Sequence, residues 1–178
     1  MSITTPRGFR ASGVTAGLKA SGRPDLALVV NDGPSHAAAA VFTSNRVEAA
    51  PVTWSRQVLS DGTVEAVILN SGGANACTGP QGFQDTHRTA ELVAAALDIS
   101  AGDVVVCSTG LIGELLPMDL IEAGDFTPHE DDLDELDDET ARLPFETLTT
   151  FFLAGERLQR NPLDADGLEQ LLAAVEVA

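Results

Sequence analysis

A chain of 178 residues with 44% hydrophobic side chains fits one globular domain, and excludes collagen, a coiled-coil rod and a wholly disordered protein. Ten Lys and Arg against 27 Asp and Glu give a net charge of −17, which makes nucleic acid and anionic membranes unfavourable partners. No apolar run approaches the roughly 20 residues of a membrane span, and the N-terminus has no apolar signal segment, so we expect a cytoplasmic protein.

Apolar runs separated by turn residues predict strands in the first part of the chain. Glycines recur between residues 6 and 22, which indicates turns and short edge strands. The sequence Asn-Asp-Gly-Pro at 31–34 and the pair Asp61-Gly62 are turn signals. Residues 51–54 begin either another strand or a short helix that extends over residues 55–59. Buried strands are predicted at residues 25–30, 37–43 and 64–69.

Helix and strand signals then alternate. A loop of small and polar residues at 70–79 precedes a helix predicted over residues 85–97, with Asp85 as its N-cap. Residues 103–107 predict an apolar strand, and a short helix is expected over residues 117–124. This alternation indicates an α/β or α+β domain. The predicted buried face of the first helix comprises Leu92, Val93, Ala96 and Leu97.

The composition changes after residue 121, where acidic residues become concentrated. Residues 130–139 are all acidic except for two leucines, which indicates a solvated loop or a frayed helix. Helices are expected at 143–153 and at 163–177, the second with Asp166 and Glu169 as a capping box. We therefore divide the chain into an α/β region over residues 1–121 and a divergent, partly helical acidic tail over residues 122–178.

Two glycine-rich strand ends are candidate sites. The loop at 70–79 lacks the spacing and the lysine of a phosphate-binding loop, so a tight loop is the ordinary interpretation. Asn70 and Asn75 could instead present amides to a polar ligand. The sequence Ser108-Thr109-Gly110 follows a buried strand, where a hydroxyl and a backbone N–H can point together at a developing oxyanion. On its own, such a sequence is usually only a turn.

The cysteines and histidines form no recognisable metal or disulfide pattern. Cys77 and Cys107 lack CxxC spacing, so we expect two buried free thiols. Cys77 and His87 could form a thiol nucleophile with its base, but a packed thiol and a surface imidazole are the more ordinary interpretation. His36 and His129 have no partners at ligand spacing, and the acidic run lacks the glycine of an EF-hand loop.

The motifs at these strand ends read Leu69-Asn-Ser-Gly-Gly-Ala-Asn-Ala-Cys-Thr-Gly79 and Cys107-Ser-Thr-Gly-Leu-Ile-Gly113. They resemble motifs of the ornithine acetyltransferase family, the bifunctional glutamate N-acetyltransferases of arginine biosynthesis. Further similar segments follow one another in unbroken order at residues 6–14, 17–22, 25–30, 40–47, 82–87 and 116–119.

The resemblance implies a two-layer α/β sandwich of the ornithine acetyltransferase type, of which this chain holds the N-terminal half. It implies a precursor that cuts itself before a threonine, which becomes the N-terminal nucleophile of a second chain. That threonine would take an acetyl group from N-acetylornithine and pass it to glutamate, without a metal or another cofactor. The family's oxyanion residues correspond to Thr109 and Gly110.

Beyond residue 121 the sequence departs from the family pattern of a Thr-Thr-Asp segment, a Lys-Gly-Ala-Gly-Met segment and an Ala-Thr cleavage site. Phe151 follows Thr149-Thr150, Leu120 stands where relatives usually have lysine, and no lysine follows Lys19. We therefore expect a truncated homologue that is inactive alone and either needs a complementing second chain or self-associates. The alternative is a non-catalytic assembly or partner-binding module with the acidic tail as its binding segment.

Overall fold

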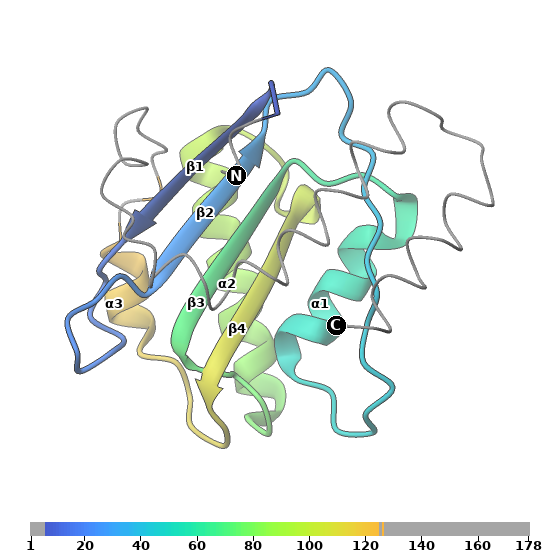
Figure 1. Cartoon of the computed structure of the whole chain (residues 1–178). Helices are drawn as coiled ribbons and strands as arrows, with labels where there is room; N and C mark the ends of the chain where they lie inside the picture. Colours follow the sequence, from blue (N-terminus) through green and yellow to red (C-terminus); the bar gives the residue numbers. More distant parts are fainter. Residues whose placement is uncertain (1–5, 125, 127–178) are drawn as a thin grey trace.

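Four strands form one mixed sheet, with helices packed against it in a second layer (Figure 1). The structure is a computed structural model that describes residues 6–124 and residue 126. The strands lie in chain order, β1-β2-β3-β4; the first two pairs are antiparallel and the last is parallel. Their bounds are Phe9–Val14 for β1, Leu26–Asn31 for β2, Ala66–Gly73 for β3 and Val104–Leu111 for β4.

The parallel pair is connected by a helix that crosses behind the sheet. Parallel neighbours need a long crossover connection, and the helix α2, Gly79–Leu97, supplies it between β3 and β4 (Figure 1). The helix α1, Ala50–Val58, lies along β4, and the short α3, Met118–Glu122, packs near α2. Two 3₁₀ turns, Leu59–Asp61 and Ala101–Asp103, complete the described elements. This arrangement confirms the predicted two-layer α/β fold.

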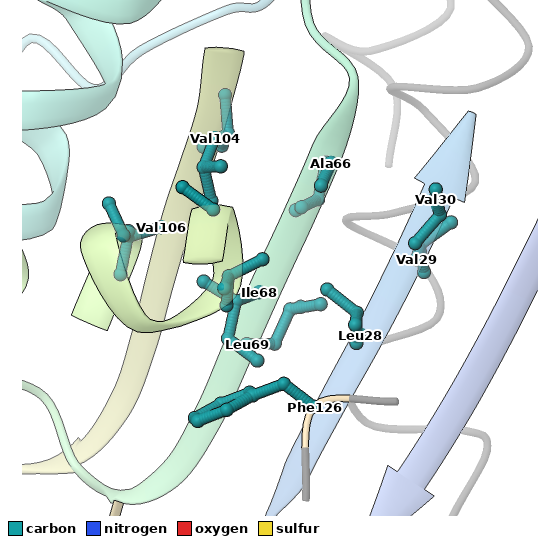
Figure 2. Packing of buried hydrophobic residues seen from close by; sticks show 14 of the residues in the cluster. Leu28, Val29, Val30, Ala66, Ile68, Leu69, Val104, Val106 and Phe126 are labelled. Atoms are coloured by element: carbon teal, nitrogen blue, oxygen red, sulfur yellow. The ribbon is translucent and has the colours of Figure 1, made fainter. Parts of the chain in front are cut away.

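The core lies on the central strands, which are apolar at consecutive positions. The register places Leu28, Ile68 and Val106 at one level of the sheet, and Val29, Val67 and Val105 at the next. All six side chains are buried, although successive residues of a strand point to opposite faces of the sheet. Figure 2 shows side chains of β2, β3 and β4 together with Phe126, which is also buried.

Side-chain hydrogen bonds fix α1 beside β4. Trp54 donates from Nε1 to the Val104 carbonyl oxygen at 2.9 Å. The Ser55 hydroxyl donates to the Val106 oxygen at 2.9 Å and accepts from the Val106 nitrogen at 3.2 Å. The helix begins with Pro51 in its first turn, a position where the missing N–H costs no hydrogen bond. Of the two alternatives for residues 51–54, the helix is therefore confirmed and the strand is wrong.

The strand predicted over residues 37–43 is wrong. Only an isolated bridge forms there, between Ala37 and Thr63, and Val41 is 53% exposed. A strand needs a neighbour to accept and donate its backbone hydrogen bonds, and an apolar run by itself does not provide one. The Phe42 ring instead contacts the guanidinium of Arg56, 5.1 Å from the ring centre.

The N-terminus of α2 was also predicted wrongly. The helix begins at Gly79, with a proline in its first turn, so Asp85 lies inside it rather than at its cap. The Asp85 carboxylate is buried and accepts a hydrogen bond from Gln81 Nε2 at 2.9 Å. Ala96 is exposed, whereas Val93 is fully buried. The buried face of the helix includes the small residues Ala90 and Ala94 alongside Val93.

Other expectations for the elements have mixed outcomes. The strands predicted at 25–30, 64–69 and 103–107 and the helix at 117–124 are confirmed, although β3 and β4 extend further than predicted. The acidic run, the helices at 143–153 and 163–177 and the capping box of Asp166 and Glu169 lie outside the described residues. In the part of the chain that the structure describes, no helix is long and apolar enough to cross a membrane.

Candidate functional site at the ends of two parallel strands

The two glycine-rich strand ends lie side by side. Because β3 and β4 are parallel, both carboxyl ends reach the same edge of the sheet (Figure 1). The register pairs Ser71 with Thr109 and Gly72 with Gly110. Thr109 and Gly110 are both exposed, so a molecule at this edge can approach them. Topology thus brings together two motifs that lie well apart in the sequence.

The backbones of the two glycines approach each other closely. Gly72 has a φ of +129° and Gly110 a φ of +136°, a region that residues with a Cβ rarely adopt. A Cβ on Gly110 would lie 2.5 Å from the Gly72 carbonyl oxygen and 2.7 Å from the Gly73 nitrogen. The path of the chain beyond Thr109 therefore requires glycine at this position.

The turn after Gly110 is attached to the loop that follows β3. The Ala74 nitrogen donates to the Leu111 oxygen, and the Gly113 nitrogen donates to the Ala76 oxygen, both at 2.8 Å. Three large apolar side chains of this turn are exposed to solvent: Leu111 at 63%, Ile112 at 67% and Leu115 at 54%. The site thus combines a fixed backbone, the exposed residue Thr109 and an apolar rim, which is formed by Leu111, Ile112 and Leu115.

The asparagine amides are used inside the fold, so the prediction that they face a ligand is wrong. Asn75 is fully buried; its Nδ2 donates to the Gly82 oxygen at 2.8 Å and to Thr86 Oγ1 at 2.9 Å. Asn70 Nδ2 donates to the Gly73 oxygen at 2.9 Å, and Asn70 Oδ1 accepts from Ser108 Oγ at 2.5 Å. Both side chains shape the loop and the strand end instead.

The predicted buried thiol at Cys77 is wrong, because Cys77 is exposed in a left-handed turn with a φ of +59°. Cys107, on β4, is partly buried, and burial raises the pKa of its thiol to about 11. Both thiols are free. His87 is exposed, as expected for a surface imidazole; its ring lies 4.9 Å from the Trp54 ring.

No metal site is formed by the residues described. Within 6–124 and 126, no group of three His, Cys, Asp or Glu side chains lies close enough together to hold an ion. His36 lies 3.7 Å from Glu65 and makes an ordinary surface contact. His129 lies outside these ranges.

Sequence reasoning missed Asp25, which the structure connects to this edge of the sheet. Its carboxylate is buried and accepts three backbone hydrogen bonds from the preceding loop. The only signal in the sequence was an acidic residue directly before an apolar strand, and this pattern is common in ordinary turns.

The chain is similar to known proteins in both sequence and fold. Residues 10–142 match the ArgJ family. An arginine biosynthesis bifunctional protein ArgJ from Streptomyces avermitilis is 69% identical over 124 residues, which are 70% of this chain and 32% of the relative. The ArgJ protein of Mycobacterium leprae is 65% identical over 127 residues, covering 68% of this chain and 31% of the relative. The chain spans about a third of the length of these curated relatives.

Two solved structures share the fold. Ornithine acetyltransferase from Mycobacterium tuberculosis, solved in complex with ornithine, has a TM-score of 0.68 and 65% identity. The alignment covers 68% of this chain and 66% of that one. The ArgJ protein of Bacillus halodurans has a TM-score of 0.68 and 40% identity, with 72% of this chain and 68% of that chain covered.

Proposed function

Because the chain belongs to the ArgJ family, we propose that its described domain supplies the oxyanion-stabilising part of an acetyltransferase that acts between N-acetylornithine and glutamate. The observation that carries this proposal is the pairing of Thr109 and Gly110, both exposed, with the glycine-rich end of β3. A solved relative of similar fold contains ornithine, which supports a small amino-acid substrate.

The chemistry proposed for this edge is acyl transfer in two steps. A threonine hydroxyl attacks the acetyl carbonyl of N-acetylornithine, its proton passes to the departing amine, and ornithine leaves an acetyl ester on the threonine. The α-amine of glutamate then attacks the ester and releases N-acetylglutamate and the free hydroxyl. Each step forms a tetrahedral intermediate with a negative oxygen, which the Thr109 hydroxyl and the Gly110 N–H would stabilise by hydrogen bonding.

The nucleophile would come from a part of the relatives that this chain does not span. Residues 122–178 hold neither a lysine nor the family's cleavage segment. The matched region covers 66% of the solved chain from M. tuberculosis but 31% of the curated protein from the same organism. The solved chain is therefore about half as long as that protein, as expected for a precursor divided into two chains.

The apolar rim supports a partner at the same edge. Leu111, Ile112 and Leu115, which lie among the six residues that follow Thr109, expose most of their surface. Clustered apolar side chains of this kind often mark a surface that another chain covers. A second polypeptide placed there would exclude water from the oxyanion residues, and electrostatic stabilisation is stronger in a water-excluded site.

The test is a complementation assay. The chain is measured for acetyl transfer from N-acetylornithine to glutamate alone, and after co-expression with the part of the S. avermitilis relative that it does not span. We expect no transfer and no self-cleavage from the chain alone, and measurable transfer from the pair. Turnover by the chain alone would contradict the proposal. A stable complex with no turnover would favour the non-catalytic assembly module.

A further inference from the structure

Asp25 connects the loop at residues 16–19 with the end of β1 and with β3. This residue is 3% exposed and lies directly before β2. Oδ1 accepts a hydrogen bond from the Ala16 nitrogen at 2.7 Å, and Oδ2 accepts from the nitrogens of Gly17 at 3.1 Å and Lys19 at 3.0 Å. An ionised carboxylate can accept all three bonds, because neither oxygen carries a proton. One side chain thus fixes the backbone of residues 16–19.

The same residue is attached to β3 through its main chain. The Asp25 carbonyl oxygen accepts from the Ser71 nitrogen at 2.8 Å. The Asp25 nitrogen donates to the Val14 oxygen at 3.0 Å, which anchors it to the end of β1. Ser71 is the register partner of Thr109. The position of Asp25 is therefore fixed relative to the strand pair that carries the candidate site.

The loop that Asp25 fixes also faces Gly72, the residue that follows Ser71 on β3. Leu18 lies between the two amides that bind Oδ2, and its backbone faces Gly72. A Cβ on Gly72 would lie 2.8 Å from the Leu18 carbonyl oxygen and 3.1 Å from the Leu18 Cβ. Gly72 is in turn the register partner of Gly110, and a Cβ on Gly110 would lie 2.5 Å from the Gly72 carbonyl oxygen. The contacts form a continuous series from the carboxylate through Leu18 and Gly72 to Gly110.

We propose that Asp25 is a positioning residue that sets the placement of Thr109 and Gly110 through the loop at residues 16–19 and the Gly72 backbone. The inference rests on the proposed function, in which the N–H of Gly110 and the hydroxyl of Thr109 meet the oxyanion. An oxyanion donor acts only if it lies within hydrogen-bond distance of the charge that develops. A shift of Gly72 would be passed on to Gly110, because the two residues are register partners and leave no room for a Cβ between their backbones.

The first test is spectroscopic and needs no turnover. Backbone amide resonances and hydrogen exchange are recorded for the full chain with Asp25→Asn, whose amide nitrogen cannot accept a hydrogen bond. We expect the Gly72, Thr109 and Gly110 signals to move, and the Ser71 amide, which donates to the Asp25 carbonyl oxygen, to exchange at least about tenfold faster. The amides of Val104 and Val106, in the same strand, should stay unchanged.

Asp32→Asn is the matched control. Asp32 follows the opposite end of β2 and pairs with Arg10 at 2.7 Å on the surface. Its replacement should leave the Gly110 signal in place. Asp25→Glu provides a second variant that keeps the charge if the asparagine chain does not fold, and it should move the same signals. Changes confined to residues 14–20 in either Asp25 variant would overturn the inference.

The second test is kinetic and uses the chain paired with the complementing polypeptide. Asp25→Asn should lower kcat about tenfold to a hundredfold, and leave the KM for N-acetylornithine within about twofold. An unchanged kcat despite shifted Gly110 signals would overturn the positioning role. Absence of turnover in the unsubstituted pair would instead contradict the proposed function, while the Gly110 signals still decide whether Asp25 controls the turn.

Discussion

Gly110 on β4 lies so close to Gly72 on β3 that a methyl group on Gly110 would lie 2.5 Å from the Gly72 carbonyl oxygen. The two residues belong to different glycine-rich motifs, and the parallel pairing of β3 and β4 brings them into register. The exposed hydroxyl of Thr109 is consequently presented by a backbone that has little freedom to shift.

Thr109→Ala tests the oxyanion role in the complemented chain. The substitution should lower kcat on the order of 10²-fold and change KM little, because the hydroxyl acts on charge that exists only in the transition state. Thr63→Ala is the control: Thr63 is also exposed and its hydroxyl donates to Asp61 Oδ1 at 2.9 Å, but it precedes β3, at the end of that strand opposite to the site. Kinetics and thermal melts are measured together, and a rate for Thr109→Ala within about threefold of the parent would rule out the role.

Gly110→Ala should destabilise the domain by about 3 kcal/mol or more, because it combines an unfavourable φ with overlap against the Gly72 backbone. Gly113→Ala is the matched comparison, since Gly113 has a φ of +87° but open space around a Cβ. We expect about 1 kcal/mol there. Urea unfolding measures both, and equal losses would show that the close approach has no energetic weight.

Ser55→Ala should lower the free energy of unfolding by about 1–3 kcal/mol. The hydroxyl is buried and bonds both the nitrogen and the oxygen of Val106, so its removal leaves two polar groups of the core without this partner. Ser21→Ala, at an exposed position with a 3.5 Å contact to the Arg23 nitrogen, should have almost no effect. Denaturant titrations of the two variants check the difference, and a loss at Ser55 no larger than at Ser21 would contradict it.

Alkylation should distinguish the two thiols. Burial favours the neutral form of Cys107 and raises its pKa to about 11, so its thiolate fraction at pH 8 is on the order of 10⁻³. Iodoacetamide should modify Cys77 in the native chain and reach Cys107 only after unfolding or as pH rises toward 11. Mass spectrometry of Cys77→Ser and Cys107→Ser chains assigns the sites. Rapid native labelling of Cys107 at pH 8 would contradict the prediction.

The apolar rim should promote self-association of the chain when no second polypeptide is present. Ile112→Asn removes the most exposed of the rim's large apolar side chains and should shift the sedimentation distribution toward monomer. Val41→Asn, at a residue 53% exposed outside the rim, should leave the distribution unchanged. A monodisperse monomer for the unsubstituted chain would contradict this prediction.

The sequence predicted β2, β3, β4 and α3 because each is an apolar or periodic run bounded by turn residues. It failed at residues 37–43, since a run that reads as a strand still needs a neighbouring strand, and at the start of α2, where Pro80 outweighs the capping preference of Asp85. Thr109 and Gly110 were identified as candidates from their position after a strand. The contribution of Asp25 depends on contacts between distant segments, so no local pattern could indicate it.

The hydrogen bonds from α1 to Val104 and Val106 also prevent a further strand from pairing with this part of β4. The groups that Trp54 and Ser55 bind belong to the outer side of β4, away from β3, which is the side that an additional strand would use. Natural proteins protect such edges from intermolecular pairing by covering them. Loss of both side chains would expose this part of β4 and open a route to edge-to-edge aggregation, so the helix protects the solubility of the domain as well as its packing.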